Sequence, residues 1–248
     1  MEKLLNYRFT DGSLKGQSFG NLFLAAMNGI SGSFDEAVHR MCDVLAITGQ
    51  VLPVTNCNVH LEAEFANGSR CLGESKIFHA KKTNNSRITQ VRLVPEHPTA
   101  LPESLQAIAD ADLIIMGPGS LYTSIIPNFL VDGISEAVAA SSAKKILVMN
   151  IMTQDGESEG YTGADHLRAL LDHAKPGIVD ICIANNAEIP EENLGPYREE
   201  GVGPLVLERE AIEAMGVRVC EYPLATGERY IRHDSDALAA AIMEVCYR

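Results

Sequence analysis

Residues 113–128 read LIIMGPGSLYTSIIPN, and this stretch decides the fold. Its apolar run, Leu113 to Met116, is typical of a strand buried on both faces of a parallel sheet. Gly117 and Gly119 allow the next segment, Gly117-Pro118-Gly119-Ser120, to turn sharply and to approach a ligand closely. Hydroxyl side chains follow where a helix would expose unpaired N–H groups, which fits a phosphate or another anion. A tight turn with Ser120 as a helix cap explains the same residues, so the stretch alone leaves both interpretations open.

Helical and strand patterns alternate around this stretch. Helices are predicted over 101–109, 130–140, 164–173, 208–215 and 234–246, and strands over 113–116, 145–151, 178–184 and 217–222. Such alternation predicts right-handed crossovers and a parallel sheet with helices on its faces. The expected fold class is therefore α/β, and ligands of such sheets bind beyond the carboxyl ends of the strands.

The first hundred residues follow a different pattern. Two helices are predicted over 20–30 and 34–47, and a short strand over 51–55. Alternating apolar residues from Val59 to Phe65, followed by Asn67-Gly68, predict a hairpin with Phe65 opposite Cys71 and Val59 opposite Ile77. With a further strand over 87–94, the segment 57–94 is expected to form an antiparallel ribbon inserted into one domain that spans residues 1–248.

Small polar residues cluster at four predicted strand ends. They are Thr55-Asn56, Gly117 to Ser120, Asn150 to Gln154 and Asn185-Asn186. Such residues are also common in ordinary turns, and one cluster would be explained in that way. Four clusters at strand ends favour a polar groove that binds phosphates, a base or sugar hydroxyls. A further Gly-rich approach to a helix, Lys15 to Asn21, either meets an anion or is capped by Ser18.

Composition excludes several classes of protein. The 248 residues carry a net charge of −13, which argues against a nucleic-acid partner. The chain has no apolar stretch of membrane-spanning length and does not open with a secretory signal, so a cytoplasmic protein is expected. Six scattered cysteines without a CxxC pair indicate free thiols rather than disulfides or zinc ligands.

No recognisable catalytic or metal-binding motif is present. The chain lacks a nucleophile elbow, a Walker-type loop and a GxGxxG fingerprint, and its histidines do not have metal-ligand spacing. His233-Asp234 is interpreted as a surface histidine followed by the N-cap of the last helix. Catalytic residues stay unassigned, and no metal ligand is expected.

Several segments, taken together, resemble the CofD-like family, and their sequences are more similar to its gluconeogenesis factor (YvcK-like) branch. The segments are KGQSFGNLFLAAM at 15–27, LPVTN at 52–56, GESKI at 73–77, GPGSLYTSIIPN at 117–128, NIMTQDGES at 150–158 and IRHD at 231–234. The resemblance covers most of the chain in order. It implies a Rossmann-like, three-layer parallel sheet that binds a nucleotide diphosphate compound.

The resemblance also implies a ligand and site residues. In the gluconeogenesis factor branch the ligand is a UDP-sugar, UDP-N-acetylglucosamine, and the proteins are linked to carbon metabolism and cell shape. The other branch comprises 2-phospho-L-lactate transferases, which use a guanosine diphosphate-linked donor with Mg²⁺. Carried onto this chain, Gly117, Gly119 and Ser120 would hold phosphate, Asn21 would line the same groove, and Thr153 and Gln154 are further candidates.

One departure from the family pattern concerns the start of the chain. Family members usually open with a strand and a GGGTG-type loop, whereas this chain begins just upstream of KGQSFGN. We therefore expect an N-terminally incomplete domain whose exposed apolar surface favours a homo-oligomer. A regulatory nucleotide-sugar-binding protein is the leading hypothesis, and a transferase or a scaffold with a vestigial groove are the alternatives.

Overall fold

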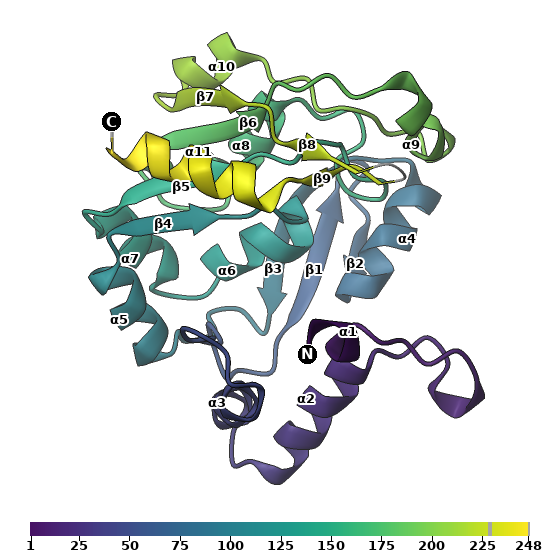
Figure 1. Ribbon diagram of the computed structural model, residues 1–248, viewed down its shortest axis with the longest axis vertical. Helices are drawn as coiled ribbons and strands as arrows, with labels where there is room; N and C mark the ends of the chain where they lie inside the picture. Colours follow the sequence, from purple (N-terminus) through teal and green to yellow (C-terminus); the bar gives the residue numbers. More distant parts are fainter. Residues whose placement is uncertain (228–229, 248) are drawn as a thin grey trace. The chain divides into compact units, whose positions relative to one another are not determined.

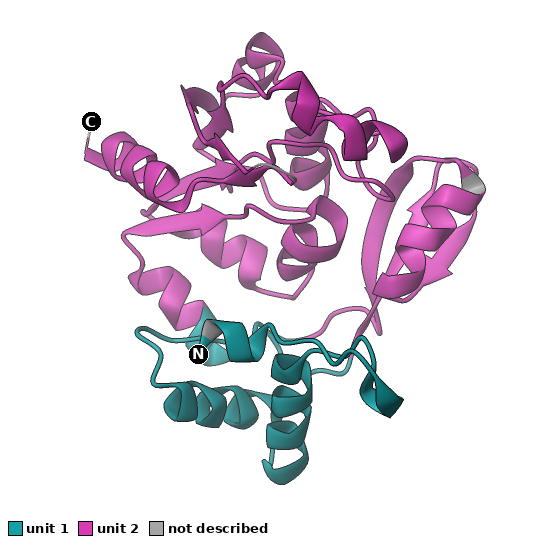
Figure 2. Cartoon of the chain, turned by 45° about the vertical axis from the view of Figure 1, so that its right-hand side comes forward, with its two compact units in different colours: residues 1–58, 99–104 teal, residues 59–98, 105–248 magenta. Residues whose placement is uncertain are grey.

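The computed structural model describes residues 1–227 and 230–247, with the side chains of Glu2 and Asn84 left aside. The chain forms two compact units (Figure 2), of which unit 1 comprises residues 1–58 and 99–104 and unit 2 comprises residues 59–98 and 105–248. The expectation of one domain over residues 1–248 stays a prediction. No helix in the described part of the chain is both long and apolar enough to span a membrane.

Unit 2 contains the predicted parallel sheet. Its strands are β4 (Leu113–Met116), β5 (Lys144–Val148), β6 (Ile181–Asn185) and β7 (Arg218–Tyr222), in the order β4-β5-β6-β7. All three neighbouring pairs are parallel, with Ile115 opposite Ile146 and Ile146 opposite Ile181. The α/β fold class predicted from the alternating pattern is confirmed.

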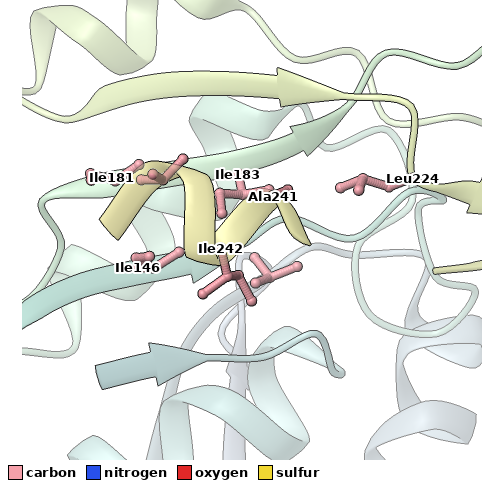
Figure 3. Packing of buried hydrophobic residues seen from close by; sticks show 8 residues of the cluster. Ile146, Ile181, Ile183, Leu224, Ala241 and Ile242 are labelled. Carbon is pink, nitrogen blue, oxygen red and sulfur yellow. The ribbon is translucent and has the colours of Figure 1, made fainter. Parts of the chain in front are cut away.

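Helices cover both faces of this sheet. α11 (Ser235–Tyr247) lies over one face, and α8 (Gly163–Asp172) lies behind the other (Figure 1). Ile146 and Ile183 of the strands pack against Ala241 and Ile242 of α11, all of them almost completely buried (Figure 3). Because β5 and β6 are buried on both faces along most of their length, the sheet is stable only between two helical layers. Further helices of unit 2 are α6 (Ile126–Phe129), α7 (Ile134–Ala140), α9 (Gly195–Glu199) and α10 (Arg209–Ala214), with a π-helical turn, η2 (Leu121–Ile125), and a 3-10 turn, η3 (Glu191–Asn193).

A second sheet of unit 2 is antiparallel. β1 (His60–Phe65) lies between β2 (Arg70–Leu72) and β3 (Ile88–Val94), and α4 (Glu74–Asn84) connects β2 to β3. Two details of the predicted ribbon are wrong. Cys71 lies opposite Ala63, not Phe65, because the turn closes at the Phe65 N–H···O=C Ser69 bond. Ile77 lies in α4 rather than in a strand, because the chain turns at Gly73 with φ +107°. A third, two-stranded sheet pairs β8 (Ala225–Thr226) with β9 (Arg232–His233).

Unit 1 is helical. It contains α1 (Glu2–Leu5), the 3-10 turn η1 (Gly12–Leu14), α2 (Phe19–Ile30) and α3 (Phe34–Leu45), and α5 (Pro102–Asp110) begins in it. Ser18 and Ser33 cap α2 and α3 by accepting backbone N–H bonds. The strand predicted over 51–55 is absent from this described segment. Two of its carbonyl groups accept bonds from distant residues at the start of α5 instead: Val54 O from Leu101 N at 2.9 Å and Pro53 O from Ser104 Oγ at 2.7 Å.

Candidate functional site

Unit 2 has a cleft of about 550 Å³ at the carboxyl ends of β4 and β5. The loop after β4 and the loop after β5 form two of its walls, and residues of α4, α9 and β9 line the others. The lining residues are Phe78, Pro118, Gly119, Ser120, Asn150 to Asp155, Tyr197, Glu200, Val202 and Ile231 to His233. Four residues that the sequence predicts for the site, Gly119, Ser120, Thr153 and Gln154, are thus brought together.

The loop after β4 is held by its glycines and by Asn150. Gly117 has φ +76°, and a Cβ atom there would lie 3.2 Å from the carbonyl oxygen of Val148. Only glycine suits this conformation and this close approach. Asn150 Nδ2 donates to the Gly119 carbonyl at 2.9 Å, while its Oδ1 accepts the Gly119 N–H at 3.3 Å. Asn150 therefore fixes the loop, and the Gly119 N–H already has a partner.

Side chains of the two loops meet at Ser120 and Gln154. Ser120 Oγ donates to Gln154 Oε1 at 2.8 Å, and the Gln154 N–H is bonded to Ser158 Oγ at 3.0 Å. Thr153 is 8% exposed, and its hydroxyl donates to the Gly203 carbonyl at 3.1 Å. Ser120 and Gln154 thus present half-buried polar atoms to the cleft, whereas Thr153 mainly ties the loop to residue 203.

The helical turn that follows Ser120 is capped by a carboxylate of the chain itself. Glu157, 4% exposed, accepts the Tyr122 N–H at 3.1 Å and the Thr123 hydroxyl proton. Burial raises the pKa of Glu157 above its usual range, against the lowering effect of the bonds from Thr123 and Tyr122. The sequence indicated unpaired N–H groups here for a ligand anion, and Glu157 takes the place of that anion at Tyr122.

The β9 wall of the cleft carries Arg232 and His233. His233 is half-buried, which corrects its interpretation as a surface residue, and its Nε2 lies 3.1 Å from the Met149 carbonyl. Burial lowers its pKa, so the ring is neutral and carries its proton on Nε2. Arg232 is exposed and forms no ion pair with any residue in the described ranges. Asp234 is the N-cap of α11, as predicted, because its Oδ1 accepts the N–H groups of Asp236 and Ala237.

The other predicted groove residues lie elsewhere. A second cavity, of about 250 Å³, shares Asn150 and Ile151 with the cleft and includes Asn185 and Asn186. The Asn185 side chain is bonded to the backbone of Ala187, Leu224 and Ala225, so its role is structural. Thr55 and Asn56 belong to unit 1, outside the cleft.

Asn21 also belongs to unit 1. It lies in the first turn of α2, where its N–H is bonded to Ser18 Oγ at 3.3 Å. Ser18 is therefore a helix cap, one of the two roles that the sequence left open for it. The place of Asn21 in a ligand groove stays a prediction.

The donor set for a divalent cation is missing from the described residues. In residues 1–227 and 230–247, no group of three or more His, Cys, Asp or Glu side chains could hold a metal ion. Of the two carboxylates that line the cleft, Asp155 is paired with Lys82. These residues do not fit a resident Mg²⁺, and no chemical step is assigned to one.

The chain is similar to proteins named gluconeogenesis factor over nearly its whole length. It is 50% identical over 244 residues to the "Putative gluconeogenesis factor" of Thermoanaerobacterium thermosulfurigenes, covering 98% of this chain and 75% of that one. It is 42% identical over 247 residues to the "Gluconeogenesis factor" of Bacillus subtilis, covering 99% of this chain and 77% of that one.

The fold has a solved counterpart. A crystal structure of a UPF0052 family member from Bacillus halodurans matches with a TM-score of 0.91 and 39% identity, over 98% of this chain and 77% of that one. The family described as "2-phospho-L-lactate transferase CofD" matches residues 1–225. This match spans both described units, from the helices of unit 1 to β8. The chain therefore belongs to the CofD family.

Proposed function

We propose that this protein binds a nucleotide sugar of the UDP-N-acetylglucosamine type and regulates carbon metabolism and cell shape. The observation that carries the proposal is the cleft at the carboxyl ends of β4 and β5, where Ser120, Gln154 and Arg232 converge. A guanidinium group binds phosphate oxygens in a bidentate way, and hydroxyl and amide groups suit sugar hydroxyls. The names of its close relatives support a regulatory role of the same kind.

The size and place of the cleft support a ligand of this class. Its volume, about 550 Å³, lies within the range of small-molecule sites. Ligands of open α/β sheets bind outside the carboxyl ends of the parallel strands. Phe78 and Tyr197 add aromatic surface to the lining, which suits a nucleobase or the apolar face of a sugar ring.

A binding role is favoured over catalysis because two titratable groups of the cleft, His233 and Asp155, already have partners. The Nε2 proton of His233 is committed to the Met149 carbonyl, and Asp155 is paired with Lys82. Neither group is placed as a free general acid or base at the cleft.

Thermal unfolding of the chain with and without UDP-N-acetylglucosamine tests this proposal. At about 100 times Kd, a ligand that binds only the folded state adds roughly 2.7 kcal/mol to stability. Inorganic phosphate alone is expected to give no comparable shift. Arg232→Gln should reduce the shift, whereas Arg218→Gln, an exposed position outside the cleft lining, should not. The absence of a shift with any UDP-sugar would overturn the proposal.

A second candidate function is a transferase, favoured by the description of the matching family. A guanosine diphosphate-linked phospholactyl donor, a deazaflavin alcohol and Mg²⁺ would be incubated with the folded protein. Formation of the phospholactylated deazaflavin supports this function, and its absence in a preparation that binds UDP-sugars excludes it. The expected homo-oligomer stays a prediction, and sedimentation at micromolar concentration tests it.

A further inference from the structure

Lys82 of α4 forms an ion pair with Asp155, a carboxylate in the wall of the cleft. The Asp155 side chain is only 10% exposed, whereas Lys82 is 47% exposed and does not itself line the cleft. A buried carboxylate that loses its partner keeps its charge in a poorly hydrated place, at a high energetic cost. The ammonium group of Lys82 therefore controls the charge that Asp155 presents to the cleft.

The charges along the cleft make this control important. Among the residues that the structure describes, two carboxylates, Asp155 and Glu200, line the cleft together with one permanent cation, Arg232. The lining is thus net negative by itself, and it becomes neutral when Lys82 is counted. The hydrogen bond to Asp155 is the main cause that raises the pKa of Lys82, and the charges of Glu200 and Glu159 add to it. Lys82 thus balances the described charges of the lining, which favours the entry of a diphosphate.

Packing holds Lys82 in this position. The Phe78 ring lies against Gly156, so closely that a Cβ atom on Gly156 would be 2.2 Å from it. The Lys82 ammonium lies 4.9 Å from the centre of the same ring, which adds a cation–π contact. One residue earlier, the almost buried Lys81 pairs with Glu159 at 2.9 Å. The helix α4 is thereby fixed on the loop 155–159.

We infer that Lys82 is a positioning residue that neutralises Asp155 and so allows the cleft to accept a phosphorylated ligand. This inference rests on the proposed function, because it requires an anionic ligand. It adds a selectivity rule to that function: the contribution of Lys82 grows with the negative charge of the ligand. A purely structural ion pair would make a different prediction, since the loss of either partner would then weaken binding of every ligand.

The inference is tested by comparing how the loss of Lys82 and the loss of Asp155 change ligand affinity. Binding of UDP, UDP-N-acetylglucosamine and uridine would be measured for the full chain by calorimetry and, for uridine, by competition. Lys82→Ala should weaken UDP binding about tenfold and leave uridine binding within twofold. Asp155→Asn should bind UDP as tightly as the unmodified chain or more tightly, and the double variant should recover affinity to within twofold of it.

Two further variants separate charge from packing. Lys82→Arg keeps the charge and should retain UDP binding, whereas Lys76→Ala removes one positive charge from the exposed side of the same helix and should change nothing. Circular dichroism and the melting temperature establish that each variant is folded.

The results distinguish a failure of the inference about Lys82 from a failure of the proposed function. If the unmodified chain binds UDP-N-acetylglucosamine and Lys82→Ala binds UDP equally well, the inference is overturned and the proposed function stands. Equal losses for UDP and uridine, or a failure of Asp155→Asn to restore binding in the double variant, also overturn the inference. If the unmodified chain binds none of the three ligands, the proposed function falls and the inference falls with it.

Discussion

Ser120 Oγ donates a hydrogen bond to Gln154 Oε1 at 2.8 Å, although the two residues are 34 positions apart in the chain. The bond joins the loop after β4 to the loop after β5, across the rim where two neighbouring parallel strands end. A network of this kind fixes both side chains in one orientation before a ligand arrives. Two of the four polar clusters predicted at strand ends, those at 117–120 and 150–154, therefore meet at this cleft, and the side chains of Ser120 and Gln154 contribute to its polar surface.

The substitution Ser120→Ala tests whether this bond prepares the cleft for its ligand. It leaves Gln154 Oε1 without its partner, so we expect an affinity loss of about tenfold for UDP-N-acetylglucosamine, measured by calorimetry. Stability should fall by about 1 kcal/mol at most, which is the usual net value of one hydrogen bond. Ser141→Ala is the matched control, because Ser141 Oγ bonds to the Ile108 carbonyl outside the cleft lining. An unchanged affinity of Ser120→Ala would show that the bond has no part in binding.

A comparison of two glycines tests the conformation of the loop after β4. Gly117 and Gly177 both have positive φ, at +76° and +86°. A Cβ atom on Gly117 would meet Ile125 Cδ1 at 3.1 Å and the Val148 carbonyl at 3.2 Å, whereas Gly177 has open space. Gly177→Ala should cost about 1 kcal/mol for backbone strain alone. Gly117→Ala should cost roughly 1 kcal/mol more, measured by urea unfolding, and equal costs would contradict the packing described here.

The central strands and helices could be predicted because neighbouring residues in the sequence determine where each of them begins and ends. The apolar run Leu113 to Met116 follows Asp112 and ends at Gly117-Pro118, and the strand β4 has the same two ends. Ser18 was one of the two alternatives that the sequence left open at 15–21, and it caps α2. The error at Ile77 has a physical reason too. The apolar pair Ile77-Phe78 between polar residues fits either a strand or a helix, and Ile77 is fully buried in the helix α4.

The site was only partly predictable, since several of its residues act through distant partners. Glu157 caps a helical turn that lies 35 positions earlier in the chain, and no local pattern marks a carboxylate for such a role. Phe78 and Tyr197 reach the cleft from α4 and α9. Arg232 and His233 lie in the IRHD segment that carried part of the family resemblance, and this segment was the available signal for them.

Tyr122 and Tyr161 form a buried pair whose hydroxyls should be energetically coupled. Their oxygens are 2.9 Å apart, and each lies 3.2 Å from the Ile88 carbonyl. The two hydroxyl protons can therefore form only two of these three hydrogen bonds at a time. Burial raises the pKa of both phenols, which keeps them protonated at neutral pH. Tyr122→Phe should cost about 1–2 kcal/mol in the free energy of unfolding.

A double-mutant cycle with Tyr161→Phe measures this coupling. The double variant should lose at least about 0.5 kcal/mol less than the sum of the single losses. Tyr247→Phe, at a position 82% exposed, is the control and should change stability little. Strict additivity of the two losses would show that the hydroxyls act independently.

His173 should make the stability of the protein depend on pH in a specific direction. Its Nε2 accepts the Val91 N–H at 3.0 Å, and its Nδ1 lies 2.6 Å from the Ala169 carbonyl, so the native ring is neutral with its proton on Nδ1. Burial lowers its pKa below the ordinary 6.5, against the raising effects of the Ala169 carbonyl and Asp172. A second proton on Nε2 would oppose the Val91 N–H and break the link from α8 to β3.

The sign of the pH dependence follows from proton binding in the two states. As pH falls below about 6.5, His173 takes up a proton in the unfolded chain but not in the native one, so the free energy of unfolding decreases. Between pH 7.5 and pH 5.5, the unmodified protein should lose stability more steeply than His173→Gln. The difference cannot exceed about 1.4 kcal/mol per pH unit, the value for one proton. His60→Gln, an exposed position on β1, should follow the unmodified protein. The other buried histidines and Glu157 are present in all three proteins, so their contributions cancel in the comparison. Parallel profiles of the free energy of unfolding against pH for His173→Gln and the unmodified protein would show that the neutral ring of His173 does not hold β3.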